Sequence, residues 1–152
     1  MRIWIRRVHL VLTWLFVAAV LYQVYLAGRA IFVSDQLWEA HVGWGWSGLP
    51  LIALLVLLSA IAGGLPRAAI GWAALPLLGV IVQFLLASFR YSGQAEVAAL
   101  HPVTALIVFG IGVVVARRAR VFLREPELML GPSGAAATGV RVEGAGRSGV
   151  SG

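Results

Sequence analysis

Four long stretches without a charged side chain limit what this chain can fold into. They cover about residues 8–27, 42–65, 68–89 and 97–116, and each is close to the ~20 residues with which a helix crosses the hydrocarbon of a bilayer. Because lipid offers no partner for backbone N–H and C=O groups, such stretches become helices or closed barrels, and the apolar positions here lack the alternation of a barrel wall. Only 12% of the 152 residues are charged, against about a quarter in soluble domains. We therefore predict an all-α, integral membrane four-helix bundle.

Arginines set the expected orientation of this bundle, since positive residues favour the cytoplasmic side of a membrane. Eight arginines flank the first span, the turn between the second and third spans, and the end of the fourth, whereas one lies in each of the other two connections. This bias predicts a multi-pass protein of a bacterial inner membrane with both termini in the cytoplasm. The eight are Arg2, Arg6, Arg7, Arg67, Arg117, Arg118, Arg120 and Arg124, against Arg29 and Arg90.

The chain divides into a membrane part, residues 1–124, and a cytoplasmic tail, residues 125–152. Glycine, alanine and serine dominate residues 131–152, and no apolar period remains there, so most of this tail is predicted to be disordered. The first span follows "MRIWIRR" and resembles a signal peptide. Its apolar stretch is longer than the usual 7–15 residues and no good cleavage site follows, so we expect it to be retained.

Two rare polar residues recur at an offset of 60 positions. Gln23 matches Gln83 and His41 matches His101, with the same spacing of 18 within each pair. This recurrence predicts a repeated two-helix unit, in which one span carries Gln near its outer end and the returning span begins with His. Because both units start and return on one side, they would be parallel repeats about an axis along the membrane normal. His41 and His101 should then face each other at equal depth.

Two facing imidazoles can ligate a heme iron from both sides, and bundle cores commonly hold such cofactors. We therefore predict that one heme b binds between His41 and His101 near the outer face, for electron transfer or heme sensing. Gln23 and Gln83 could bond to each other, orient the histidines as cofactor-site residues, or only join helices. Small residues on the histidine faces would make room for the macrocycle, or would let the helices pack closely without it: Gly45, Gly48, Ala105, Val108 and Gly112.

Two further expectations concern histidine environments. Residues before proline avoid helical angles, so the fourth span is expected to begin at Pro102 with His101 as its cap. His9, Thr13 and Gln23 follow helical spacing and should face the bundle interior together. His9 has no second histidine at its depth, and we interpret it as an interfacial or propionate-binding residue beside Arg6.

A cofactor-free structural or accessory membrane subunit is the alternative function, because histidines at span ends need no ligand. The chain has no cysteine, which excludes thiolate sites, and its acids lie only in loops and the tail, which excludes a buried carboxylate relay. No nucleotide-binding motif or catalytic triad is present, so no enzymatic activity is assigned. The net charge of +6 is gathered beside the spans, and its expected partner is the lipid bilayer and not nucleic acid. A membrane protein partner or a homo-oligomer is compatible with this pattern.

Several short motifs resemble a family of small four-span bacterial membrane proteins that is known only as a domain of unknown function. They include "RRVHLVLTWLF", "YQVYLAG", "AHVGWGWSG", "QFLLAS" and "LHPVTALIVFG", and they extend over roughly residues 5–120. This resemblance implies the four-span architecture and no activity. More remotely, the spans opened by His41 and His101 resemble heme b bundles such as diheme transmembrane cytochromes and the half-units of heme A synthase. Those proteins generally carry more histidines.

Overall fold

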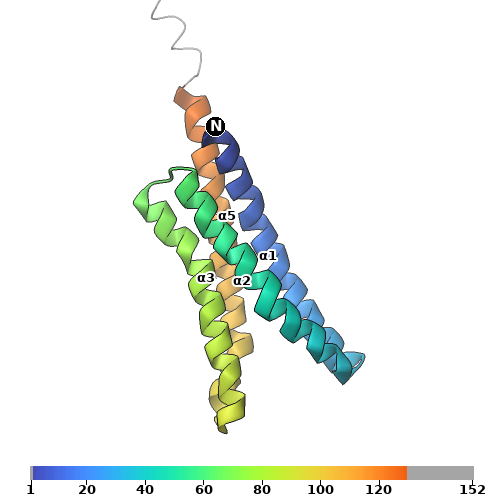
Figure 1. Ribbon diagram of the computed structural model, residues 1–152. Helices are drawn as coiled ribbons and strands as arrows, with labels where there is room; N and C mark the ends of the chain where they lie inside the picture. The colour runs from blue at the N-terminus through green and yellow to red at the C-terminus, as the bar shows by residue number, and fades with distance from the viewer. Residues whose placement is uncertain (1, 130–152) are drawn as a thin grey trace, which may run out of the picture.

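The computed structural model describes residues 2–129, and these form four long helices with short helical connections (Figure 1). No strand occurs in this part of the chain, as the sequence predicts. The elements are α1 (Arg2–Phe32), η1 (Asp35–Leu37), α2 (Trp38–Ala62), α3 (Arg67–Ser88), η2 (Phe89–Ser92), α4 (Ala95–Ala98) and α5 (Leu100–Met129).

The four long helices surround one core in the order α1, α2, α3, α5. Each packs against its neighbours in the chain, and α1 closes the bundle against α5. All four are long and apolar enough to cross a membrane. Alanines are fully buried where helices approach closely, as at Ala53, Ala60 and Ala73, while large apolar side chains such as Leu106 point outward. An apolar exterior, with small residues where helices approach closely, is typical of membrane helix bundles.

The turn between α2 and α3 is tight. Gly64 adopts a left-handed φ of 61°, which only glycine tolerates readily, and the amide of Leu65 donates back to the carbonyl of Ala60. This turn ends α2 at Ala62, three residues before the end of the predicted span. Pro66 then precedes α3, where its missing N–H costs nothing.

The last helix extends further than the sequence suggested. We placed the start of the tail at residue 125, but α5 continues to Met129. Arginine, leucine and glutamate sustain a helix well, although Pro126 removes one backbone hydrogen bond in this stretch. The predicted disorder of residues 131–152 lies outside the described residues.

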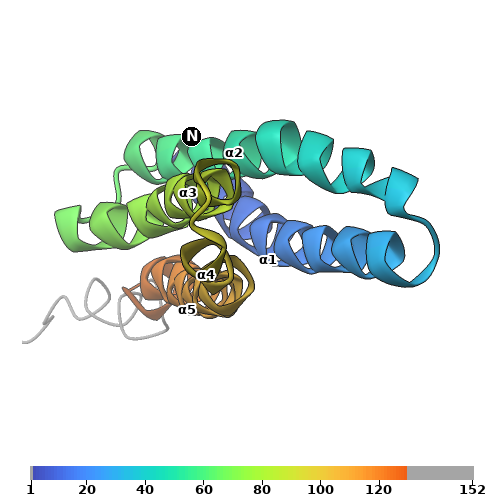
Figure 2. The same ribbon diagram turned by 90° about the horizontal axis from the view of Figure 1, so that it is seen from below.

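The two ends of the bundle differ in shape. At one end, the start of α1, the α2–α3 turn and the later part of α5 lie together, and we call this the arginine end. Toward the other end, the α1–α2 hairpin diverges from the α3–α5 hairpin, as two views of the molecule show (Figures 1 and 2). We call this second end the splayed end. It carries His41 and His101 at the starts of α2 and α5.

Candidate functional site

His41 and His101 face each other at the splayed end. Their ring centroids lie 6.4 Å apart with an angle of 72° between the ring planes. His41 belongs to the α1–α2 hairpin and His101 to the α3–α5 hairpin, so the pair joins the two halves of the bundle. The predicted approach of these two histidines is therefore observed.

Both imidazoles are anchored in the same way. Nδ1 of His41 lies 3.1 Å from the carbonyl oxygen of Gln23, and Nδ1 of His101 lies 3.1 Å from the carbonyl oxygen of Gln83. A carbonyl oxygen only accepts, so Nδ1 carries the proton in each ring and Nε2 carries the lone pair. The same contact across the same 18 residues in both hairpins supports the two-helix repeat.

The glutamine side chains, in contrast, differ between the hairpins. Nε2 of Gln23 lies 3.2 Å from Nε2 of His41 and donates to the carbonyl of His41 at 3.0 Å. The Gln83 amide instead donates to Oγ1 of Thr104 at 2.7 Å. Each glutamine thus bonds within its own hairpin, and the alternative in which the two amides bond to each other is wrong. Thr104, which the sequence analysis did not single out, was detectable as a polar residue one turn after His101.

His101 lies inside its helix and does not cap it. We expected the fourth span to begin at Pro102, but α5 begins at Leu100, and the hydroxyl of Thr104 bonds back to the carbonyls of Leu100 and His101. Pro102 is tolerated because it falls in the first turn, where backbone N–H groups have no carbonyl to reach. Its restriction on the preceding residue is a preference that the surrounding packing overrides.

The small residues near the histidines are in contact with side chains of the bundle itself. A Cβ on Gly45 would lie 2.9 Å from Nε2 of Gln23, and a Cβ on Gly48 would lie 2.5 Å from the ring of Trp44. Gly112 packs in the same way against Phe16 of α1. The Gly45 and Gly112 contacts join different helices and agree with the interpretation that small residues permit close helix packing, whereas the Gly48 contact lies within α2.

Aromatic rings surround the histidine pair. The Trp38 ring stands edge-on to His41 with centroids 5.3 Å apart, and Trp46 of α2 stacks on Phe84 of α3 at 4.4 Å with an angle of 8°. The Trp46–Phe84 stack joins the two hairpins near the histidines. Sequence patterns alone did not reveal Phe84, because nothing in an apolar span marks which ring meets a partner on another helix.

His9 lies toward the arginine end and is buried, with 3% of its surface exposed. Its Nδ1 contacts the carbonyl of Val56 at 3.2 Å and Oγ of Ser59 at 3.0 Å. Thr13 is buried beside it, so the predicted inward stripe is confirmed at these two positions. Val56 and Ser59 of α2 hold the His9 ring against the bundle, and the interfacial or propionate-binding role of His9 stays a prediction.

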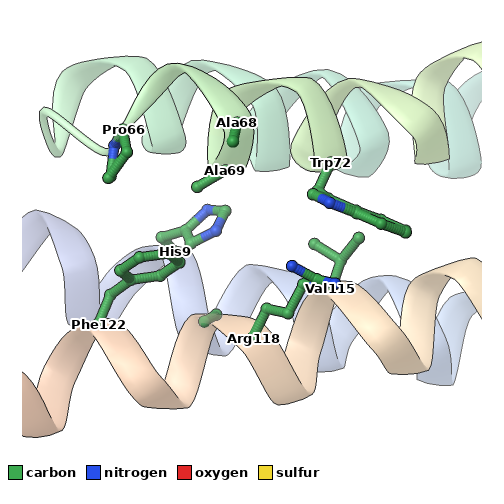
Figure 3. Close-up of a pocket in the computed structure, with 9 residues that line it drawn as sticks. His9, Pro66, Ala68, Ala69, Trp72, Val115, Arg118 and Phe122 are labelled. Carbon is green, nitrogen blue, oxygen red and sulfur yellow. The ribbon is translucent and has the colours of Figure 1, made fainter.

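A pocket of about 150 Å³ opens beside His9 at the arginine end (Figure 3). Its walls come from α1, from the first turns of α3 and from the later part of α5. The lining residues are His9, Pro66, Ala68, Ala69, Trp72, Val115, Arg118, Ala119 and Phe122. Within residues 2–129, no three His, Cys, Asp or Glu side chains gather as a metal site would require. The His41–His101 pair offers two imidazoles and, in that range, no third ligand of these types.

Comparison with known proteins leaves the activity open. Residues 23–90, from the middle of α1 to η2, match a family model described as a family of unknown function (DUF6220). That segment includes Gln23, His41 and Gln83 but neither His9 nor His101. No curated protein matches the chain. No solved structure matches it either, so the remote likeness to heme b bundles has no support from these comparisons.

Proposed function

We propose that this protein binds one heme b between His41 and His101 at the splayed end of its membrane bundle. The observation that carries the proposal is the imidazole pair, with ring centroids 6.4 Å apart. Two imidazoles on one iron, each with a metal–nitrogen bond of about 2 Å, would have ring centroids roughly 6 Å apart. The centroid separation of the pair is close to this value.

The hydrogen bonds of the two rings add support. Ligating histidines usually donate their second ring N–H to a carbonyl or carboxylate, which fixes the tautomer and raises the basicity of the metal-binding nitrogen. Gln23 and Gln83 supply such carbonyls to His41 and His101. For His41 to become a ligand, the Gln23 amide must give up its contact with Nε2 of His41. His41 and His101 would hold the heme, and the bound group would supply one-electron transfer or heme sensing.

A cofactor-free structural or accessory subunit is the second candidate. It is favoured by the packing of Gly45 against Gln23 and of Gly48 against Trp44, which uses the space that a macrocycle would need beside His41. In this case His41 and Gln23 would only fasten α1 to α2, and His101 and Gln83 would fasten α3 to α5. A fastening role requires no ligand at the imidazole pair.

The experiment that separates these candidates is a difference spectrum. Full-length protein expressed with added heme should show a reduced-minus-oxidised b-type band, and His41→Ala and His101→Ala should each abolish it. His9→Ala is the matched control and should keep the band, since His9 lies toward the arginine end and hydrogen-bonds to Val56 and Ser59 of α2. His101→Met tests ligation without emptying the site, because a thioether ligand should shift the band. A colourless wild-type protein, or a band that survives both alanine variants, would favour the accessory subunit.

A further inference from the structure

The pocket at the arginine end combines an imidazole, a cation and apolar walls (Figure 3). We propose that it binds the headgroup of an anionic phospholipid that also carries free hydroxyl groups, as phosphatidylglycerol does. In this arrangement the phosphate pairs with Arg118 and a headgroup hydroxyl donates to Nε2 of His9. The site is independent of the histidine pair, which lies at the opposite end of the bundle.

His9 supplies the acceptor. Oγ of Ser59 donates its proton to the carbonyl of Val56 at 2.9 Å, so both groups that face Nδ1 of His9 accept. Nδ1 therefore carries the ring proton and Nε2 carries a lone pair. Among the described residues no side chain or backbone group donates to this Nε2, although the residue is only 3% exposed. Nε2 is therefore free to accept, and a hydroxyl in the adjoining pocket would donate to it.

Arg118 supplies the positive charge. Its guanidinium carbon lies 4.2 Å from the centroid of the Trp72 ring, which holds the group at the pocket wall. A cation over an aromatic face leaves the N–H groups at the guanidinium edge free, and those groups match phosphate oxygens. The first turn of α3 lines the same pocket through Ala68 and Ala69, so the positive end of that helix dipole adds to the attraction for an anion.

Size and surroundings favour a lipid over a free solute. A pocket of about 150 Å³ lies below the range of about 300–1,000 Å³ of sites that enclose a whole small molecule. It fits a headgroup whose remainder stays outside. Val114 and Val121, on the same stretch of α5 as Arg118, are exposed, so acyl chains would meet an apolar surface next to the site. Free glycerol phosphate shares the headgroup chemistry but cannot use that surface.

Native mass spectrometry of the full-length protein in detergent would test the assignment. Phosphatidylglycerol should bind at least tenfold more tightly than phosphatidylethanolamine, which lacks the net charge and the hydroxyls, and more tightly than phosphatidic acid, which lacks the glycerol hydroxyls. Arg118→Gln should weaken phosphatidylglycerol binding about tenfold. Arg117→Gln removes the same charge one residue away, outside the pocket lining, and should leave the affinity unchanged.

A second variant blocks the site without changing charge. Ala69→Leu places a larger side chain in the pocket wall and should lower phosphatidylglycerol binding as strongly as Arg118→Gln does. Equal affinity of the Arg118 and Arg117 variants would overturn the proposal, because the attraction would then belong to the general positive charge of this end. Free glycerol phosphate that binds as tightly as phosphatidylglycerol would overturn the lipid assignment and leave a soluble phosphate ester as the ligand.

Discussion

The α1–α2 and α3–α5 hairpins share a backbone contact but differ in their side-chain bonds. In both, a histidine Nδ1 donates to the carbonyl of a glutamine 18 residues earlier at 3.1 Å. The Gln23 amide also engages its histidine, whereas the Gln83 amide turns to Thr104. At an offset of 60 residues Thr104 corresponds to Trp44, which has no hydroxyl to offer. One substitution between the repeats thus explains why Nε2 of His41 is engaged and Nε2 of His101 is not.

Glycine use differs between the hairpins as well. In α2, Gly45 faces the flexible end of Gln23, with the amide nitrogen 2.9 Å from an ideal Cβ position. In α3, Gly79 faces the branched side chain of Val108, with Cγ2 at 2.8 Å. A side chain added at Gly45 can push an amide aside, but one added at Gly79 meets the short, stiff side chain of Val108. The α3–α5 hairpin is therefore the less adaptable of the two.

The prediction with the largest expected effect concerns topology, namely whether the two hairpins cross the membrane in the same direction. Arginine placement predicts that both connections of the splayed end, near Ser34 and near Gly93, lie outside the cell membrane while both termini lie inside. Reporter fusions at Ser34 and Gly93 should both give external activity, and a fusion at the C-terminus should give internal activity. An externally active C-terminal reporter would break the equivalence of the hairpins and the four-span topology with it.

The number and type of elements were predictable because lipid permits few solutions. A run such as residues 68–89, with no charge and about the length of one span, has no stable alternative to a helix in a bilayer. The approach of His41 and His101 was predictable for a different reason. A repeat places equivalent residues at equivalent depth, and both histidines and both glutamines are rare enough in this chain to mark the offset.

The side-chain partners were not predictable, since they depend on which neighbour lies a few ångströms nearer. Spacing places Gln83 on an inward face, but only the position of Thr104 in space decides that the amide bonds there. The burial of His9 likewise depends on Ser59 and Val56, about 50 residues away in the chain. A glycine at position 48 is compatible with a neighbouring macrocycle and with the Trp44 ring, so the sequence did not distinguish the two.

A packing variant should sharpen the contrast in adaptability. Gly79→Leu forces a side chain against Val108 and should lower the free energy of unfolding by about 1–3 kcal/mol, the usual cost of overpacking. Unfolding of the detergent-solubilised protein by denaturant would measure the change. Gly71→Leu is the matched control on the same helix, because nothing lies within 4 Å of its Cβ position.

Removal of the opposing side chain completes this test. Val108→Ala added to Gly79→Leu should restore part of the lost stability, since the two residues are in direct contact and their effects should not add. Gly45→Ala in the other hairpin should cost less than Gly79→Leu, because the Gln23 amide can move away. If Gly71→Leu and Gly79→Leu lower the free energy of unfolding equally, the effect comes from the helix itself and not from the contact between α3 and α5.

The smallest expected effect on stability concerns the side-chain amides of Gln23 and Gln83. Gln23→Leu removes two hydrogen bonds and leaves Nε2 of His41 without its donor, so it should cost about 1 kcal/mol of stability. Gln83→Leu should cost less, because the Thr104 hydroxyl still donates to the carbonyls of its own helix. Thermal unfolding of both variants, beside the wild-type protein, would measure the difference.

The same pair of variants links this comparison to the proposed heme. If iron competes with the Gln23 amide for Nε2 of His41, Gln23→Leu should retain the b-type band and bind added heme more tightly than the wild-type protein does. Gln83→Leu should leave the heme affinity unchanged, because its amide does not contact Nε2 of His101. Equal stability losses and equal heme affinities in the two variants would mean that the asymmetry between the hairpins has no energetic consequence. A weaker band in Gln23→Leu alone would instead show that the amide helps to orient the ligand.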